Sequence, residues 1–296
     1  MLLVANPASR QGMRRRAPAL RAFRKAGVGC DLLLTAGPGD AASAVRERAA
    51  DYEAVFTLGG DGTAMEVIGA LAGTGRPVGV LPAGTGNLLA RTLGVPLGVS
   101  RAVPALLNGD RAWIDLGRLA DGRRFAFAAG VGIDARMIED TPARLKRHLG
   151  VLAYALSAGR ALLRRDLFHA RVTVDGRTYD GPAAAVMVAN FGAILGDLIR
   201  LGPDIRQDDG LLDCCVFAPR TVGDVARVMW RLARKDFRPD PCLTYLPGRH
   251  IRVETHPPLR VQADGELVGR TPFEVHVDAR AAQLLVPRTA PPAYSA

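Results

Sequence analysis

Short apolar runs alternate with helix-length amphipathic stretches over the first 110 residues of the chain. The first of these runs ends at the Asn6-Pro7 pair and the third at Gly59, and both are common chain-reversal signals. Strands separated by helices of this length predict a parallel sheet that is covered by helices on both faces. We expect strands at 2–5, 32–34, 54–58 and 78–81, and helices at 14–25, 41–50, 63–72 and from 88 onward.

The pattern changes near Trp113, beyond which short strands dominate. Turn signals recur at Asp121-Gly122, Asp175-Gly176, Pro247-Gly248 and Asp264-Gly265. This spacing predicts an antiparallel sheet or sandwich with inserted helices. We expect strands at 125–129, 170–174, 183–189, 211–217, 251–254, 259–263 and 273–277, and helices at 142–165 and 222–235.

The length of 296 residues agrees with two domains. We predict an α/β domain over 1–112, a mainly antiparallel β-sandwich domain with inserted helices over 113–288, and a flexible tail over 289–296. The N-terminus has no secretory pattern, and no apolar run is long enough to span a bilayer, so we expect a cytoplasmic protein. The four cysteines form no CxxC pair and read as core residues.

The formal net charge of +10 favours anionic partners. Thirty-six of the 39 basic residues are arginines, a bias that reflects composition more than function. Aromatic residues make up only 5% of the chain and do not alternate with the basic ones, so we expect no nucleic-acid partner.

The strongest local signal is Gly59-Gly60-Asp61-Gly62-Thr63, between a predicted strand and a predicted helix. Three residues without a Cβ atom let an anionic group approach the backbone N–H groups, and the helix dipole favours phosphate there. Asp61 is an acid at such a site, so we expect it to hold Mg²⁺ or to accept a proton beside the phosphate. The alternative is a plain turn with Asp61 as a helix cap.

A second glycine-rich turn, Gly84-Thr85-Gly86-Asn87, follows the next predicted strand. The carboxyl ends of parallel strands meet at one edge of a sheet, where α/β folds bind ligands. Two such loops on successive strands therefore predict a phosphate site. Neither loop is a Walker A sequence or a GxGxxG fingerprint, so those nucleotide folds are not supported.

These two loops, together with Asn6-Pro7-Ala8-Ser9, resemble the N-terminal signatures of the diacylglycerol/sphingosine lipid kinase superfamily, and of the bacterial soluble diacylglycerol kinases in particular. Further segments that resemble the family follow in its order, at 130–135, 149–154, 208–213 and 263–266. GGDGT alone is shared with NAD kinases, whereas the ordered set is specific. The resemblance implies an α/β nucleotide-binding domain, a β-sandwich domain and an active site in the cleft between them.

The resemblance further implies that the γ-phosphoryl group of ATP is transferred to the hydroxyl of diacylglycerol or a related lipid alcohol. It places catalytic carboxylates at Asp61, Asp264 and Glu266, without deciding which is the general base. It implies a Mg²⁺ site formed by the Asp209 carboxylate and the carbonyls of Arg206 and Leu211. The ATP-binding residues expected from the two loops and the first signature are Asn6, Gly59, Gly60, Gly62, Thr63, Gly84, Thr85 and Asn87.

Several other interpretations stay open. For Asp264-Gly265 the alternative is a plain type I′ hairpin turn, and for Asp209-Gly210 a solvated turn. An NAD kinase or a catalytically silent nucleotide- or lipid-binding regulator would carry much of the same pattern. Basic residues that flank the apolar stretch 149–156 could rest on the inner, anionic membrane surface, or edge an ordinary packed helix. The sequence leaves the lipid acceptor and the oligomeric state, a homodimer included, undecided.

Overall fold

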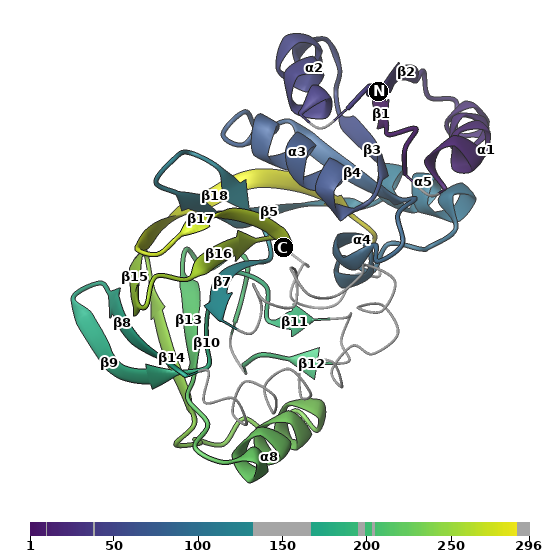
Figure 1. Ribbon diagram of the computed structural model, residues 1–296. Coiled ribbons are helices and arrows are strands. Elements are labelled where there is room, and N and C mark those ends of the chain that lie inside the picture. Colours follow the sequence, from purple (N-terminus) through teal and green to yellow (C-terminus); the bar gives the residue numbers. More distant parts are fainter. Residues whose placement is uncertain (10, 38, 133–166, 195–198, 203–204, 289–296) are drawn as a thin grey trace. The chain divides into compact units, whose positions relative to one another are not determined.

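A computed structural model of the chain describes residues 1–9, 11–37, 39–132, 167–194, 199–202 and 205–288 (Figure 1). It divides into two compact units. Unit 1 comprises Met1–Ile114 and the described residues from Arg280 onward, and unit 2 comprises Asp115–Ala279. The chain passes from one unit to the other inside two strands, β5 (Asp110–Leu119) and β18 (Phe273–Val286).

Unit 1 is built from alternating strands and helices. Its strands are β1 (Leu2–Ala5), β2 (Asp31–Leu34), β3 (Val55–Gly59), β4 (Pro77–Pro82), the start of β5 and the end of β18. Its helices are α1 (Gly12–Lys25), α2 (Asp40–Arg48), the 3-10 helix η1 (Ala49–Asp51), α3 (Asp61–Leu71), α4 (Leu88–Thr92) and α5 (Val99–Leu107).

The sheet of unit 1 has the order β2-β1-β3-β4-β18, and each neighbouring pair is parallel. The chain runs outward from β1 to β2 and then crosses back to β3 and β4. Right-handed crossovers therefore place α1 on one face and α2 and α3 on the other. In agreement, α1 packs beside α5 and α2 beside α3. The predicted parallel sheet with helices on both faces is confirmed.

The inner strands β1, β3 and β4 of unit 1 are buried along their whole length because both faces of the sheet are covered. All four residues of β1 are buried. Phe56 of β3 lies edge-on to Phe23 of α1, with ring centroids 4.9 Å apart. The same Phe56 ring covers Gly79 of β4, where a Cβ atom would lie 2.4 Å from it. A large and a small residue thus fit together across neighbouring strands.

Unit 2 is rich in strands. They are the end of β5, β6 (Arg124–Phe125), β7 (Ala128–Gly132), β8 (Phe168–Val174), β9 (Arg177–Ala183), β10 (Ala185–Ala189), β11 (Ala193–Ile194), β12 (Ile199–Arg200), β13 (Leu212–Phe217), β14 (Leu243–Gly248), β15 (His250–His256), β16 (Arg260–Ala263), β17 (Glu266–Arg270) and the start of β18. The described helix of unit 2 is α8 (Val222–Ala233).

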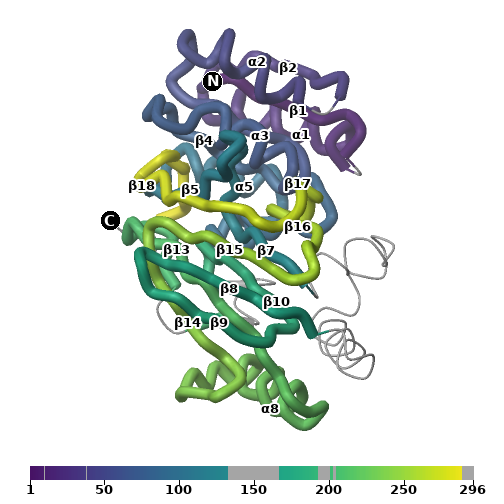
Figure 2. The backbone as a smooth tube through the Cα atoms, turned by 60° about the vertical axis from the view of Figure 1, so that its left-hand side comes forward, coloured from purple at the N-terminus to yellow at the C-terminus, as the bar shows by residue number. Residues whose placement is uncertain are grey.

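Two antiparallel layers enclose the core of unit 2 (Figure 2). One has the order β14-β13-β10-β7-β16-β17, and the other has the order β18-β15-β8-β9. Alternate side chains of both layers meet in one buried cluster, such as Val172 and Val253 from one layer and Val188 and Val216 from the other. The predicted antiparallel sandwich is confirmed.

Three local expectations need correction or cannot be compared. The strand expected at 125–129 is broken between β6 and β7, because the backbone N–H groups of Ala126 and Phe127 donate to Asp264 rather than to a strand. Pro247-Gly248 is no turn but the end of β14, an edge strand, where a residue without N–H is tolerated. The helix expected at 142–165 and the segment 149–154 lie outside the described residues, as do the last residues of 130–135.

The division of the chain also differs from the expected boundaries. Residues 280–288 cluster with unit 1, although the sequence pattern placed them in the second domain. The physical reason is that Gln283 and Leu284 of β18 pair in parallel with Pro77 and Val78 of β4. Among the described helices, none is long and apolar enough to cross a bilayer.

Candidate functional site

The strand order of unit 1 reverses direction beside β1, between β1 and β3. In open α/β sheets a ligand crevice forms at such a point, outside the carboxyl ends of the strands. Asn6 follows β1 directly, and Gly60 and Asp61 follow β3. The two glycine-rich loops and the first signature therefore converge at this edge of the sheet.

Asn6 links the first signature to the GGDGT loop. Its amide nitrogen donates to the Thr63 hydroxyl at 3.1 Å, and its amide oxygen accepts from the Ala8 N–H at 2.9 Å. Thr63 is buried, and a Cβ atom on Gly59 would lie 2.7 Å from the Cβ atom of Thr63. The absence of a side chain at Gly59 is thus a packing requirement of this turn.

The two glycine-rich loops touch through backbone atoms. A Cβ atom built on Gly84 would lie 2.5 Å from the Cα atom of Gly60, closer than real Cβ contacts come. Asn87 fixes the second loop, because its side-chain oxygen accepts from the Gly84 N–H at 2.8 Å and its nitrogen donates to the Gly84 carbonyl at 3.1 Å. Asn87 itself has φ +49°, which asparagine tolerates well. The loops form one continuous backbone surface.

Asp61 is the first residue of α3, whose N-terminus no side chain caps. Its Oδ1 atom accepts from the backbone N–H of Leu89 at 3.0 Å, so the carboxylate caps the short helix α4 and not its own helix. Asp61 is half-buried, while Gly62 and Thr85 are exposed. The open N-terminus of α3 leaves backbone N–H groups directed toward the edge of the sheet, as an anion site requires.

In unit 2, Asp264 lies in the hairpin between β16 and β17. Asp264 and Gly265 have φ values of +46° and +90°, as in a type I′ turn. The carboxylate accepts three backbone hydrogen bonds, from Ala126 at 2.8 Å, Phe127 at 2.9 Å and Ala128 at 3.1 Å. Asp264 thus anchors the hairpin to the break between β6 and β7. Two residues further on, Glu266 is exposed.

The expected metal residues lie on the loop before β13. Asp209 accepts from the Leu211 N–H at 3.0 Å, and the Arg206 side chain pairs with Asp208 at 3.1 Å. Partial desolvation raises the pKa of Asp209, and the nearby charge of Asp115 raises it further.

Sequence reasoning missed Asp115. This residue is fully buried in β5, and its Oδ2 atom accepts from the Gly210 N–H at 2.6 Å. Its own N–H donates to the Gln207 carbonyl at 2.6 Å. Two neighbouring carboxylates, one of them buried, repel each other unless a cation lies close by. A lone acid inside the apolar run 114–116 was the signal that could have revealed it.

Asn190 is a second missed residue of the same region. It is fully buried, and its side-chain nitrogen donates to the carbonyls of Asp115 and Ala126, both at 2.8 Å. Its side-chain oxygen has no hydrogen-bond partner among the described atoms. Asn190 ties β5 to the segment that Asp264 anchors, so both predicted regions of unit 2 share one polar network.

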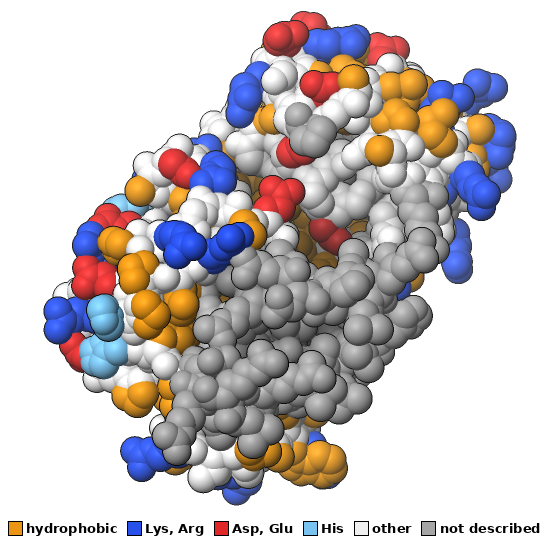
Figure 3. Space-filling view, in the orientation of Figure 1, with side chains coloured by type: hydrophobic (Ala, Val, Ile, Leu, Met, Phe, Trp, Pro, Cys, Tyr) orange, Lys and Arg blue, Asp and Glu red, His pale blue; other side chains and the backbone are white. Residues whose placement is uncertain are grey.

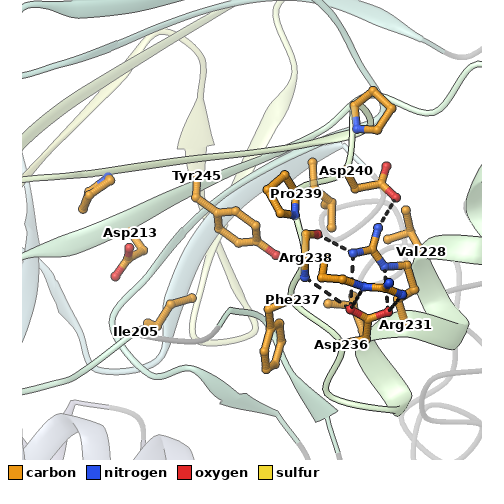
Figure 4. A pocket seen from close by; sticks show the side chains of 14 residues that line it. Ile205, Asp213, Val228, Arg231, Asp236, Phe237, Arg238, Pro239, Asp240 and Tyr245 are labelled. Carbon is orange, nitrogen blue, oxygen red and sulfur yellow. Dashed lines mark hydrogen bonds and ion pairs between the residues drawn. The ribbon is translucent and has the colours of Figure 1, made fainter.

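Two other features of unit 2 lie apart from the predicted residues. His250, Glu274 and His276 group on β15 and β18, but the histidine rings stack face to face and Arg252 already pairs with Glu274, so we assign no metal to them. A cavity of about 600 Å³ lies between α8 and the β13–β14 pair (Figure 4). None of the predicted site residues lines it.

The chain matches two family models that together cover most of its length. Residues 1–119 match the diacylglycerol kinase catalytic domain, and residues 128–286 match the YegS C-terminal NAD kinase beta sandwich-like domain. The chain is 30% identical to a diacylglycerol kinase of Bacillus subtilis strain 168, over 92% of this chain and 91% of the relative.

Two further similarities differ in extent. A crystal structure of a candidate diacylglycerol kinase from Bacillus anthracis superposes with a TM-score of 0.81 at 25% identity, over 99% of this chain and 96% of that one. An uncharacterized protein of Synechocystis is 30% identical over 79% of this chain. The present chain spans about half of that relative, 54% of its length.

Proposed function

The chain belongs to the diacylglycerol kinase catalytic-domain family, and we propose that it is an ATP-dependent lipid kinase acting on diacylglycerol or a related lipid alcohol. The observation that carries the proposal is the backbone contact between Gly60 and Gly84 at the carboxyl edge of the sheet. This contact brings two glycine backbones together beside the open N-terminus of α3, where exposed N–H groups suit the phosphates of a nucleotide.

The residues of unit 1 have distinct roles in this proposal. Backbone N–H groups of the two loops bind the phosphates, with Thr63 positioned by Asn6 and Thr85 open to the ligand. Asp61 stands at the same edge with its position fixed by Leu89. Phosphoryl transfer depends on positioning and charge stabilisation more than on covalent chemistry, so a rigid loop pair is the main requirement.

The carboxylates of unit 2 fit a hard divalent cation. Asp115 and Asp209 offer oxygen ligands only. The pKa of Asp209 is raised mainly by partial desolvation and further by the charge of Asp115, and a bound Mg²⁺ would favour both charged carboxylates. We place Mg²⁺ at these two carboxylates, with the backbone carbonyls of Arg206 and Leu211 as further ligands. When bound, the ion would neutralise negative charge and order the loop before β13.

The proposed reaction forms a bond between the lipid hydroxyl oxygen and the γ-phosphorus and breaks the bond from that phosphorus to the β–γ bridging oxygen. The hydroxyl proton passes to a carboxylate, and ADP leaves. Asp61 and the exposed Glu266 are the preferred acceptors of this proton. Asp264 is the weaker choice, because both its oxygens already accept backbone hydrogen bonds.

The test is transfer of label from γ-labelled ATP to lipid alcohols in mixed micelles, with and without Mg²⁺. We expect a labelled phospholipid with the wild-type chain and a loss of at least about 100-fold with Asp61→Ala. Asp51→Asn, an exposed acid outside both loops, is the matched control and should retain full activity.

Two outcomes would replace the proposal. Label transfer to NAD⁺ and to no lipid would identify an NAD kinase activity, for which the second matched model gives a specific reason. Binding of ATP without transfer to any acceptor would identify a nucleotide-binding regulator.

A further inference from the structure

Helix α8 presents an apolar stripe to solvent. Its inner residues Val225, Val228 and Leu232 are buried. On the opposite side Trp230 is 64% exposed and Val222 is 49% exposed, and among the described elements α8 alone contributes two large exposed apolar side chains. The exposed alanines 226 and 233 complete the stripe at helical spacing.

The inner side of α8 is already occupied by its own unit. Val228 and Leu232 pack on Cys242, with Phe237 and Leu243 beside them, and they line the cavity of Figure 4. In Figures 1 and 2 the helix lies at one end of unit 2, next to β14. The outer stripe therefore serves no packing purpose within the described part of the unit.

Cations surround this stripe. Residues 220–240 contain six basic and three acidic side chains. Each acid is paired with an arginine, Asp224 with Arg227 at 2.7 Å, Asp236 with Arg238 at 2.7 Å and Asp240 with Arg231 at 2.8 Å.

The remaining cations of the segment are Arg220, Arg234 and Lys235, all exposed. No ion pair involves them among the described residues. The helix dipole can account for Arg234 and Lys235 at the C-terminus, but not for Arg220, which precedes the N-terminus, where the dipole disfavours a cation. Figure 3 shows hydrophobic side chains at the surface where α8 lies, with basic ones close by.

From these contacts we infer that the outer face of α8 docks on an anionic phospholipid bilayer. The Arg234 guanidinium lies 5.4 Å from the Trp230 ring centroid, so the cation and the aromatic ring would lie at a similar depth in the headgroup region of a bilayer. Tryptophan favours the membrane interface, where its ring is apolar and its N–H stays hydrated. An apolar stripe with basic residues at both ends is the pattern of an interfacial helix. The inference rests on the proposed function in that a lipid kinase must reach its acceptor in a membrane.

The two tryptophans of the chain provide a direct test. In a Trp113→Phe variant of the full chain, Trp230 is the sole indole. We expect vesicles of phosphatidylglycerol that contain brominated acyl chains to quench its emission and shift it to the blue. Vesicles of phosphatidylcholine should do neither.

Binding should depend on the local charge. Each cation near an anionic surface contributes about fivefold to the partition coefficient, so Arg234→Glu with Lys235→Glu should weaken vesicle binding by at least about 25-fold. Trp230→Gln should weaken it as well. The matched control is Arg177→Glu with Arg249→Glu, which makes the same change in net charge at exposed positions of unit 2 outside α8.

The outcomes separate this inference from the proposed function. On short-chain, water-soluble diacylglycerol the α8 variants should keep wild-type activity, while on vesicles they should lose it. If no acceptor is phosphorylated but Trp230 still enters the vesicles, the proposed function fails and the docking face stands. Unchanged Trp230 emission, equal weakening by the control variant, or self-association that Trp230→Gln abolishes would overturn the docking face.

Discussion

Replacing Gly84 by alanine tests the contact between the two glycine-rich loops. The new Cβ atom would lie 2.5 Å from the Cα atom of Gly60 and 3.3 Å from its nitrogen. Ordinary contacts begin at 3.4 Å, so the loops must separate by about 1 Å. Gly84 does not have a positive φ, so the alanine meets no backbone strain and its effect is steric. Overpacking of this kind costs about 1–3 kcal/mol.

The measurement is thermal unfolding together with ATP titration. We expect Gly84→Ala to lower Tm by about 3–10 °C and kcat/KM by about 100-fold, since a shift of 1 Å displaces the phosphates. Gly60→Ala approaches the same contact from the other side, and its Cβ atom would lie at an ordinary 3.7 Å from Gly84. Gly60→Ala should lower the free energy of unfolding by less than about 1 kcal/mol, because Gly60 is the N-cap of α3 and glycine is only moderately preferred over alanine there. Equal destabilisation by both variants, or none by Gly84→Ala, would refute the reasoning.

Three further predictions concern carboxylates. Asp264→Asn should destabilise unit 2 by about 2–4 kcal/mol in urea unfolding because it weakens three backbone hydrogen bonds, whereas Glu266→Gln at an exposed position should cost less than about 0.5 kcal/mol. Asp209→Asn should leave the metal-free protein at least as stable at pH 7 and abolish the rise in Tm with Mg²⁺. Because the pKa of Asp209 is raised, its protonation stabilises the metal-free fold as pH falls. Protons then compete with Mg²⁺ for this carboxylate, so the rise in Tm with Mg²⁺ should disappear at a higher pH than it would with an aspartate of unshifted pKa. Backbone hydrogen bonds, first of all from the Thr221 N–H, lower the pKa of Asp224 to about 2. The ionised carboxylate therefore stabilises the fold above pH 3.8, and this contribution is lost as pH falls through about 2. In acid unfolding followed by circular dichroism, Asp224→Asn should reduce this pH dependence.

Local sequence patterns predicted the strands and helices of the first unit and the positions of its glycine-rich loops. The strand and helix periods of the first 110 residues, and the glycines at the ends of β3 and β4, follow from backbone chemistry within a few residues. Once the strand order β2-β1-β3-β4 is known, crossover handedness fixes which face of the sheet each helix covers.

Features that depend on distant partners were not predictable in this way. The break at Ala126 is set by a carboxylate 138 residues further along the chain. Asp115 looks like an isolated polar residue in a strand until Gly210, 95 residues away, is placed against it. Residues 282–286 follow an ordinary strand pattern, and nothing within them indicates that they pair with β4.

The last strand of unit 1 has a consequence for synthesis on the ribosome. Ala282, Leu284 and Val286 are almost fully buried in unit 1, yet they are translated after the whole of unit 2. The α/β sheet therefore emerges first but leaves the exposed edge of β4 without its parallel neighbour until the end of β18 has been synthesised. Unpaired edges of this kind bind other strands. Nascent chains that stall before residue 280 should be the aggregation-prone species of this protein, while the strand-rich unit, whose residues are contiguous, can fold as it leaves the exit tunnel.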